Sequence, residues 1–214
     1  MRTLDFIPNT SLKLIQSKNH FRMTSDSVIL SEFMQIRSRD KVLDIGTNNG
    51  VLLLVVGLKS KERCVGIDIH EEAIEIAKEN AELNHLPHLS FEHSSVQNFM
   101  SDTFDVCICN PPYHAYAQSH KDDPANHDVY LSLEDLAIHS YRLLKDKGRL
   151  VMILKTPRVY ECIDVMNQHA LKLKRLQSIH HSLKHSASSV CLEFVKNGKD
   201  ELKIEAPIFH HIEK

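Results

Sequence analysis

The stretch Lys41-Val42-Leu43-Asp44-Ile45-Gly46-Thr47-Asn48-Asn49-Gly50 joins a short apolar run to a glycine-containing loop. A short apolar run bounded by turn residues is typical of a buried strand, and a helical pattern resumes from Gly50 to Leu58. Glycine lets the backbone approach a ligand closely, and Asn is among the few other residues that tolerate positive φ. The loop lacks the G-x-G-x-x-G pattern and therefore fits a dinucleotide site poorly.

The alternation of strand and helix continues along the chain. Further strands are expected at 63–68, 89–92, 104–109 and 149–154, and helices at 71–83, from 132 to about 145 and from 156 to about 169. Two final strand-like runs, at about 172–179 and 188–195, follow without an intervening helix and should pair antiparallel. We therefore expect an α/β fold with a mostly parallel seven-stranded sheet, an antiparallel C-terminal hairpin and helices on both faces.

Length and composition indicate one globular unit. The chain has 214 residues, 42% of them apolar, enough for a substantial core. Residues 1–40 read as an N-terminal extension with one helix from about Ser25, and residues 41–214 as the main domain, the two forming a single compact unit. The sequence contains no long uncharged apolar run, so we expect no transmembrane span. Asp5 and Pro8 interrupt the apolar stretch that a signal peptide needs. Five scattered cysteines indicate reduced core thiols in a cytoplasmic protein.

The net charge of −2 conceals an asymmetry. Residues 1–140 carry 12 basic and 20 acidic side chains, whereas residues 141–196 carry 11 basic and four acidic ones. A basic third on an acidic body suggests an anionic partner that approaches from one side. Ordinary solvated faces are the alternative explanation.

The turn Asn110-Pro111-Pro112-Tyr113 follows directly after the apolar run 104–109. The Asn side chain offers a carbonyl acceptor, and the prolines fix the local backbone without donating hydrogen bonds. The carbonyl of Pro111 supplies a second acceptor, and the ring of Tyr113 can lie flat against a base. This turn predicts an enzyme that modifies an exocyclic amino group.

Two carboxylates lie where a ligand is expected. In a doubly wound sheet the ligand sits at the carboxyl ends of the central strands, where the winding reverses. Asp44 would lie near the positive end of a nucleoside-type ligand with a cationic amino-acid tail. Asp68, at the end of the second strand, can accept two hydrogen bonds from a ribose diol.

Together these features resemble the class I S-adenosylmethionine-dependent methyltransferases, whose fold is Rossmann-like. Over nearly its full length the chain is similar to the bacterial tRNA adenine-N6 methyltransferases that act on the adenine beside the valine tRNA anticodon. The similarity is carried by the stretches Phe21–Leu30, Val42–Leu54, Asn110–Tyr113, Leu131–Leu136, Cys191–Gly198 and Glu205–Pro207.

The resemblance implies S-adenosyl-L-methionine as cofactor, tRNA as substrate and no metal, and we expect a monomer that does not bind membranes. The residues implied at the cofactor are Phe21, as a lid, with Thr24, Asp26, Asp44, Gly46, Thr47, Asn48, Gly50, Asp68, Ile69, Ser95, Val96 and Asn110. The residues implied in catalysis are Asn110, Pro111, Pro112 and Tyr113.

Two positions depart from the family pattern. Asn48 stands where glycine is usual, which predicts local backbone strain or a shifted contact. Ser94-Ser95-Val96 stands where many relatives place an acidic residue that binds the adenine amino group. A hydroxyl or a backbone N–H would replace that contact here, and Val96 could pack on the ring.

Candidate RNA contacts are the basic side chains Lys155 and Arg158, after the fifth expected strand, and Lys184, at the final hairpin. If they bind phosphates, affinity for RNA should fall steeply with added salt. His114, His120 and His127 crowd the loop after the active-site turn, but their spacing matches no zinc pattern.

Other functions stay open at this point. The same chemistry could methylate a glutamine of a release factor, or an amino group of DNA or ribosomal RNA. Release-factor enzymes usually carry a helical domain ahead of the first motif, and the roughly 40 residues before Asp44 match the tRNA group better. A non-catalytic module that binds RNA or the cofactor is a further alternative, against which the complete Asn110–Tyr113 turn argues.

Overall fold

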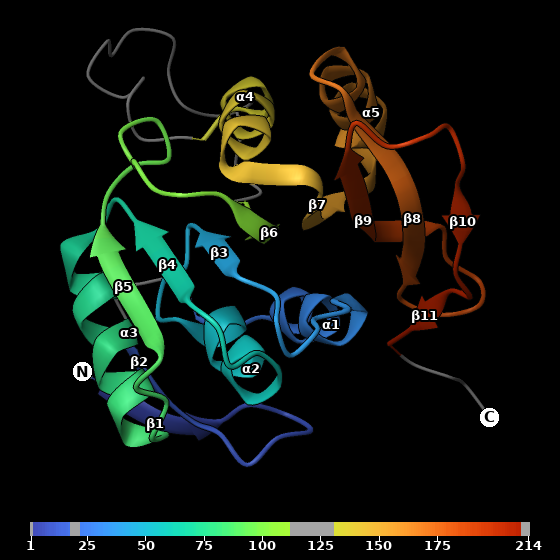
Figure 1. Cartoon of the computed structure of the whole chain (residues 1–214). Helices are drawn as coiled ribbons and strands as arrows, with labels where there is room; N and C mark the ends of the chain where they lie inside the picture. Colours follow the sequence, from blue (N-terminus) through green and yellow to red (C-terminus); the bar gives the residue numbers. More distant parts are fainter. Residues whose placement is uncertain (1, 18–21, 112–130, 211–214) are drawn as a thin grey trace, which may run out of the picture.

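The computed structural model describes residues 2–17, 22–111 and 131–210, in which strands and helices alternate (Figure 1). The strands are β1 (Arg2–Phe6), β2 (Lys13–Ser17), β3 (Val42–Ile45), β4 (Cys64–Asp68), β5 (Leu89–His93), β6 (Phe104–Cys109), β7 (Leu144–Lys155), β8 (Leu171–His180), β9 (Ala187–Lys196), β10 (Lys203–Ile204) and β11 (Ile208–Phe209). The helices are α1 (Ser25–Phe33), α2 (Val51–Lys59), α3 (Glu71–Leu83), α4 (Leu133–Leu143) and α5 (Val159–Gln168), with a 3-10 turn η2 (Thr156–Arg158) ahead of α5.

The main sheet has the strand order β10-β8-β9-β7-β6-β3-β4-β5, and β11 pairs with β8 as well. Strands β3 to β7 run parallel, and β9 is antiparallel to both β7 and β8. The expected mostly parallel sheet of seven strands with an antiparallel C-terminal hairpin is confirmed. The two-residue strands β10 and β11 both add to β8 in parallel, so the sheet has nine strands in the described residues.

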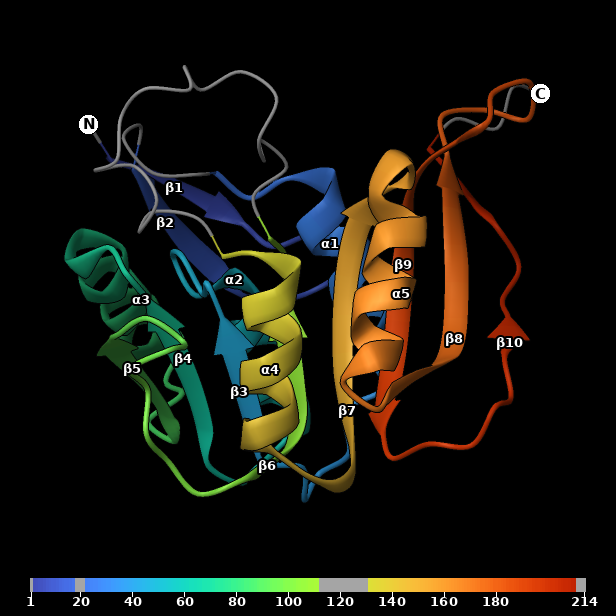
Figure 2. The ribbon, with the colours of Figure 1, turned by 90° about the horizontal axis from the view of Figure 1, so that it is seen from above.

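Helices cover both faces of this sheet, with α4 and α5 on one face and α1, α2 and α3 on the other (Figure 2). Successive residues of a strand point to opposite faces, so Val42 packs in the core beneath α2 while Leu43 packs in the core beneath α4. Each fully buried aliphatic side chain of this kind contributes about 1.5–3 kcal/mol. The two cores hold the central strands, and therefore the loops at their ends, in place.

The boundary between α4 and β7 differs from the sequence expectation. The helix ends at Leu143 and β7 begins at Leu144, which pairs with Phe104. The register then shifts, because the residues up to Gly148 form an irregularity in which Lys147 has φ 60°. Gly148 therefore lies inside a long, irregular strand and does not separate a helix from a strand.

The sequence did not predict the hairpin of β1 and β2. The two strands pair antiparallel, with Asp5 opposite Leu14, and form a sheet of their own. The hairpin packs on α3, and Leu14 joins the same core as Leu30 and Phe33 of α1. The N-terminal segment thus shares a core with the rest of the chain.

All five cysteines are free and buried, as expected for reduced core thiols. Burial raises the pKa of the thiols of Cys162 and Cys191 to about 12. Among the described residues no helix combines the length and the apolar character that crossing a membrane requires.

Candidate active site

The loop between β3 and α2 has three residues with positive φ: Gly46 at 74°, Asn48 at 52° and Gly50 at 83°. The backbone N–H groups of Gly46 and Thr47 both donate to the carbonyl of Ile67, each over 2.9 Å. Asn48 takes up the left-handed conformation, which bears on the expectation of backbone strain or a shifted contact there, and Asn tolerates this conformation better than most residues. We call residues 44–50 the cofactor loop.

Asp44 is 1% exposed at the end of β3. Its Oδ2 accepts a hydrogen bond of 2.7 Å from the hydroxyl of Thr47, and its Oδ1 is buried without a partner among the described residues. Burial raises the pKa of Asp44 to about 7, an effect that the Thr47 hydroxyl opposes and nearby Asp68 reinforces. A buried carboxylate with an unpartnered oxygen is suited to a cationic ligand group, which fits the amino end of S-adenosyl-L-methionine.

Asp68 lies at the end of β4, the strand beside β3, two residues beyond Gly66, which pairs with Asp44. One of its oxygens accepts from the backbone N–H of Asn48 over 2.9 Å, and the other accepts from the N–H of His70 over 3.0 Å. Each carboxylate oxygen retains a lone pair, so a ribose diol can still bind. The next side chain, Ile69, is 39% exposed, as is suitable for contact with a flat ring.

The residues after β5 divide between surface and core. Ser95 Oγ accepts from the backbone N–H of Asn98 over 3.3 Å. Val96 is 4% exposed and packs in the core with Phe99, while its carbonyl accepts from Arg142 over 3.1 Å. Of this pair, Ser95 has the polar groups that a base amino group would need.

The first turn of α1 contacts the end of β7. Thr24 is the N-cap of α1 and accepts from the N–H of Ser27. Buried Asp26 forms an ion pair of 2.9 Å with Lys155, whose ammonium also donates to Ser189 Oγ over 2.9 Å. Phe21, the expected lid, lies outside the described residues.

Asn110 follows the last residue of β6, beside the start of the cofactor loop in the sheet register. Its Nδ2 donates to Ser27 Oγ over 3.1 Å, and Pro111 is buried. Pro112 and Tyr113 lie outside the described residues, as do His114, His120 and His127. Ser27 lies within the Phe21–Leu30 stretch that carries the family resemblance. No sequence signal indicated that its hydroxyl contacts Asn110, because a serine at this position is also typical of the start of a helix.

The carboxyl ends of β3, β4 and β6 thus bring Asp44, Asp68 and Asn110 to one edge of the sheet. This edge combines an amide held in one orientation, a buried carboxylate and a loop with positive φ angles. Such an arrangement can bind a cationic nucleoside-type ligand and present an acceptor to an amino group.

Most basic side chains of residues 141–196 are engaged by other groups of the chain in the structure. Lys155 is paired with Asp26, and Arg158 donates two hydrogen bonds to Glu161 at 3.0 and 3.1 Å. Most other basic side chains of 141–196 also donate to carboxylates or carbonyls of the chain. Lys184 is exposed in the turn between β8 and β9. The charge asymmetry therefore creates much less open positive surface than the sequence suggested.

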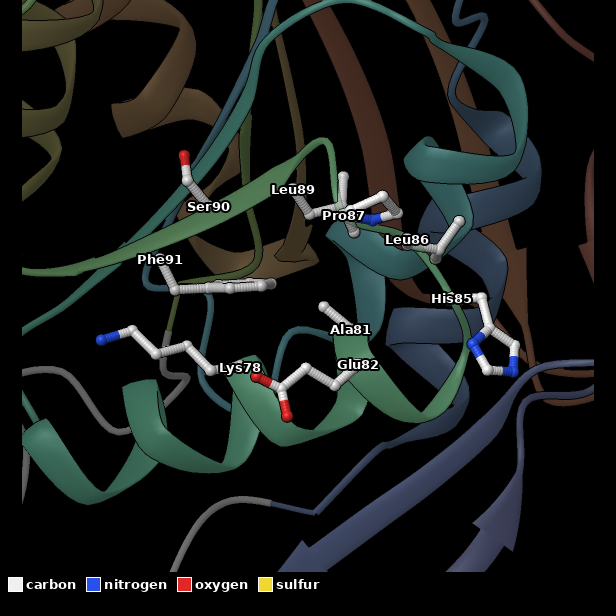
Figure 3. A pocket seen from close by; sticks show the side chains of 9 residues that line it. All are labelled: Lys78, Ala81, Glu82, His85, Leu86, Pro87, Leu89, Ser90 and Phe91. Carbon is white, nitrogen blue, oxygen red and sulfur yellow. The ribbon is translucent and has the colours of Figure 1, made fainter.

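A pocket of about 690 Å³ lies away from this edge, between the second half of α3 and the start of β5 (Figure 3). It is lined by Lys78, Ala81, Glu82, His85, Leu86, Pro87, Leu89, Ser90 and Phe91. None of the described site residues lines it. The amino end of β5 is opposite the edge where parallel strands bind ligands, so this pocket is not the cofactor site.

Comparison with known proteins decides the family. Residues 15–181 match the family described as the methyltransferase small domain, which covers more than half of the chain. The chain belongs to this family. It is a methyltransferase with the class I fold, and S-adenosyl-L-methionine is its cofactor.

Individual methyltransferases are also similar. A Vibrio campbellii protein named tRNA1(Val) (adenine(37)-N6)-methyltransferase is 29% identical over 184 residues, which are 83% of this chain and 77% of the relative. A provisionally named protein N5-glutamine methyltransferase from Methanocaldococcus jannaschii is 32% identical over 113 residues, which are 52% of this chain and 56% of the relative. Among solved structures, the T. thermophilus 16S rRNA N2 G1207 methyltransferase has a TM-score of 0.67 at 19% identity, over 92% of this chain and 50% of that one.

Proposed function

We propose that this methyltransferase transfers a methyl group to N6 of an adenine in tRNA, the adenine next to the anticodon of valine tRNA. The observation that carries the proposal is the amide of Asn110, held by Ser27 at the carboxyl end of β6. The resemblance to relatives named for this reaction supports the choice of base and RNA.

The catalytic difficulty lies in the substrate, because the lone pair of an aromatic amine is delocalised into the ring. S-adenosyl-L-methionine would supply a methyl group bonded to a positively charged sulfur. The amine nitrogen would bond to the methyl carbon as the carbon–sulfur bond breaks, leaving S-adenosylhomocysteine, and one N–H proton would be lost to solvent. Asn110 Oδ1 and the carbonyl of Pro111 would hold the two N–H hydrogens and favour a pyramidal nitrogen. Such contacts stabilise chiefly the transition state, and losing one well-aligned contact costs about 3 kcal/mol, or about a hundredfold in rate.

The methyl donor would be held by the cofactor loop and the residues around it. Asp44 would bind the cationic amino group, Asp68 the ribose diol, and Ile69 and Ser95 the adenine. Gly46, Thr47, Asn48 and Gly50 would let the backbone approach the donor. Tyr113 is proposed to stack on the target base, which contributes about 1–3 kcal/mol.

Residues 1–40 are proposed to close over the cofactor. Two contacts support this role, because Asp26 binds Lys155 of β7 and Ser27 binds Asn110 of β6. Both anchor the start of α1 to the active-site edge. Phe21 and Thr24 precede these anchors directly.

Lys184 is proposed as a phosphate contact, since it is exposed in the β8–β9 turn. This turn follows the carboxyl end of β8. Because β9 is antiparallel to both β7 and β8, β8 runs in the same direction as β7 and ends at the active-site edge. Lys155 and Arg158, also proposed from the sequence, would have to exchange their carboxylate partners for phosphates.

The decisive experiment is methylation of purified tRNA transcripts followed by mass spectrometry of the nucleosides. Valine tRNA should gain N6-methyladenosine, and a transcript with guanine in place of adenine 37 should not. Methylation of the substituted transcript to the same extent would place the modification elsewhere. Absence of the product from both transcripts would contradict the proposal.

Methylation of a protein glutamine is the second candidate, supported by the 32% identical relative. Incubation with release factors and labelled donor distinguishes the two, because label in protein and none in tRNA would favour the second candidate.

A further inference from the structure

Asn80, on α3, is fully buried yet lies outside the residues assigned to the site. Its Oδ1 accepts from the N–H of Ile15 over 2.6 Å, and its Nδ2 donates to the carbonyl of Ile15 over 3.0 Å. The same Nδ2 donates to the carbonyl of Asn49 over 2.9 Å. One side chain therefore joins the N-terminal hairpin to the cofactor loop.

On the loop side, the contact falls between two positions with positive φ. Asn49 lies between Asn48 and Gly50, which both have positive φ. Residues in this conformation persist where the surrounding structure over-determines them. Asn48 is held through its N–H by Asp68, and Asn49 is held through its carbonyl by Asn80. These two bonds hold the turn from opposite sides.

On the hairpin side, the Asn80 amide bonds both the N–H and the carbonyl of Ile15 in β2, as the backbone of a neighbouring strand would. Asn84, one helical turn later, repeats the arrangement, because its Oδ1 accepts from the N–H of Lys13 and its Nδ2 donates to the carbonyl of Lys13. Residues four apart share one face of a helix, and residues two apart share one side of a strand. The two amides thus pair with the free edge of β2. Asn84 makes no contact with the cofactor loop among its hydrogen bonds in the described residues.

We propose that Asn80 is a positioning residue that sets the conformation of the cofactor loop and couples it to docking of the N-terminal hairpin. Cofactor binding then favours the docked hairpin, and the docked hairpin favours the loop that binds the cofactor. The proposal rests on S-adenosyl-L-methionine occupying this loop. It adds a residue that touches neither the cofactor nor the base.

Paired variants test the loop contact. Asn80→Ala removes the bonds to both Ile15 and Asn49, whereas Asn84→Ala removes only the bonds to the hairpin and to the helix itself. Isothermal titration with S-adenosylhomocysteine should show an affinity about tenfold weaker for Asn80→Ala, as expected for one lost polar contact, and a clearly smaller loss for Asn84→Ala, which weakens docking of the hairpin but keeps the contact with the cofactor loop. The KM for the methyl donor should rise in Asn80→Ala while kcat at saturation stays near that of the original protein. Equal losses of affinity in both variants, or none in Asn80→Ala, would overturn the proposal.

Hydrogen exchange of the unmodified protein tests the coupling even where Asn80→Ala does not fold. Saturation with S-adenosylhomocysteine should slow exchange of the Ile15 amide as well as the amides of the cofactor loop. Slower exchange in the loop with no change at Ile15 would overturn the coupling. Failure of the unmodified protein to bind S-adenosylhomocysteine would instead overturn the cofactor site, and this inference with it.

Discussion

Ser27 Oγ accepts a 3.1 Å hydrogen bond from Nδ2 of Asn110, 83 residues away in the chain. An amide whose nitrogen is engaged in this way presents its Oδ1 on the other branch of the side chain. Ser27 is itself 5% exposed and is placed by the N-cap of α1. The bond therefore fixes the orientation of the Asn110 amide.

Replacement Ser27→Ala should lower kcat about tenfold, because the amide of Asn110 loses one neutral hydrogen bond and its fixed orientation. Affinity for S-adenosylhomocysteine should stay within about twofold of the original, since the lost bond involves neither Asp44 nor Asp68, the two carboxylates proposed to hold the donor. Steady-state kinetics and calorimetry measure the two effects. Ser31→Ala is the matched control on the same helix, because within the described residues the hydroxyl of Ser31 bonds locally, to the carbonyl of Val28. Equal kcat values for the two variants would contradict the role given to Ser27.

Replacement Asn110→Ala should abolish methyl transfer while leaving cofactor affinity nearly unchanged. The Oδ1 acceptor is needed chiefly in the transition state, and its loss is expected to cost at least about a hundredfold in rate. Single-turnover assays with tRNA and titration with S-adenosylhomocysteine separate chemistry from binding. Retained turnover in this variant would remove the proposed role of the turn.

Cofactor affinity should depend on pH through Asp44. Burial raises its pKa from 3.8 to about 7, so in the free protein the carboxyl is neutral below that pH and ionised above it. Binding of a cationic amino group requires the ionised form, and affinity should increase by about tenfold as the pH rises from about 6 to 8 and then level off. Calorimetric titration across this range in buffers of equal ionic strength measures the change. In Asp44→Asn the affinity should be weak and should lose this dependence.

The same group affects the ligand-free protein in the opposite sense. Between the unfolded value of 3.8 and the folded value of about 7, the folded state binds more protons than the unfolded state. The contribution of Asp44 to stability therefore falls as the pH rises through this window. As the pH rises from about 4 to 7, the unfolding free energy of the original protein should therefore fall relative to that of Asp44→Asn. A difference between the two proteins that stays constant over this range would contradict the assignment.

Replacement Gly66→Ala should destabilise the protein by about 1–3 kcal/mol through overpacking. A Cβ at this position would lie 2.6 Å from the Thr47 hydroxyl and 2.8 Å from the ring of Phe91. Relief would move Thr47 away from Asp44 and weaken cofactor binding as well. Gly57→Ala is the control, because its Cβ would meet flexible leucine ends at 3.2 Å and a helix gains about 1 kcal/mol from alanine. Urea unfolding of both variants should show the larger loss for Gly66→Ala.

The salt dependence of tRNA binding should separate the basic side chains. Replacement Lys184→Ala should reduce the slope of log Kd against log salt by about 0.7–0.9, the effect of one phosphate contact. The double variant Lys155→Ala, Arg158→Ala should leave the slope near that of the original, because both cations pair with carboxylates of the chain. A larger change in the double variant would show that these ion pairs open to bind RNA.

Much of the fold and part of the site could be predicted from the sequence, because the decisive signals are local. The apolar runs of β3 to β6 and the helical spacing of α3 are visible within short windows. At Asn48, which stands where glycine is usual, the sequence predicted backbone strain or a shifted contact, and the structure has φ 52° there. Asp44 and Asp68 were placed at strand ends by the same reasoning, and both lie there.

The remainder depends on partners distant in the chain. The β1–β2 hairpin is bound by side-chain amides of α3, and no pattern within residues 2–17 predicts these contacts. The pairing of Lys155 with Asp26 spans 129 residues, so a count of charges could not show that this cation is compensated. Strands β10 and β11 contain two residues each, too few to produce a periodic pattern. Ser27 became visible as a contact of Asn110 only once α1 was placed against β6.

The burial of all five cysteines makes the chain convenient to label. Their thiols lie in β4, β6, α5 and β9, within the two cores, and burial raises their pKa above the usual range. Thiolate is the form that reacts with maleimides, so the folded protein should leave these positions unmodified. A cysteine introduced in the exposed β8–β9 turn would then carry a single fluorophore, without prior removal of the native sulfur atoms.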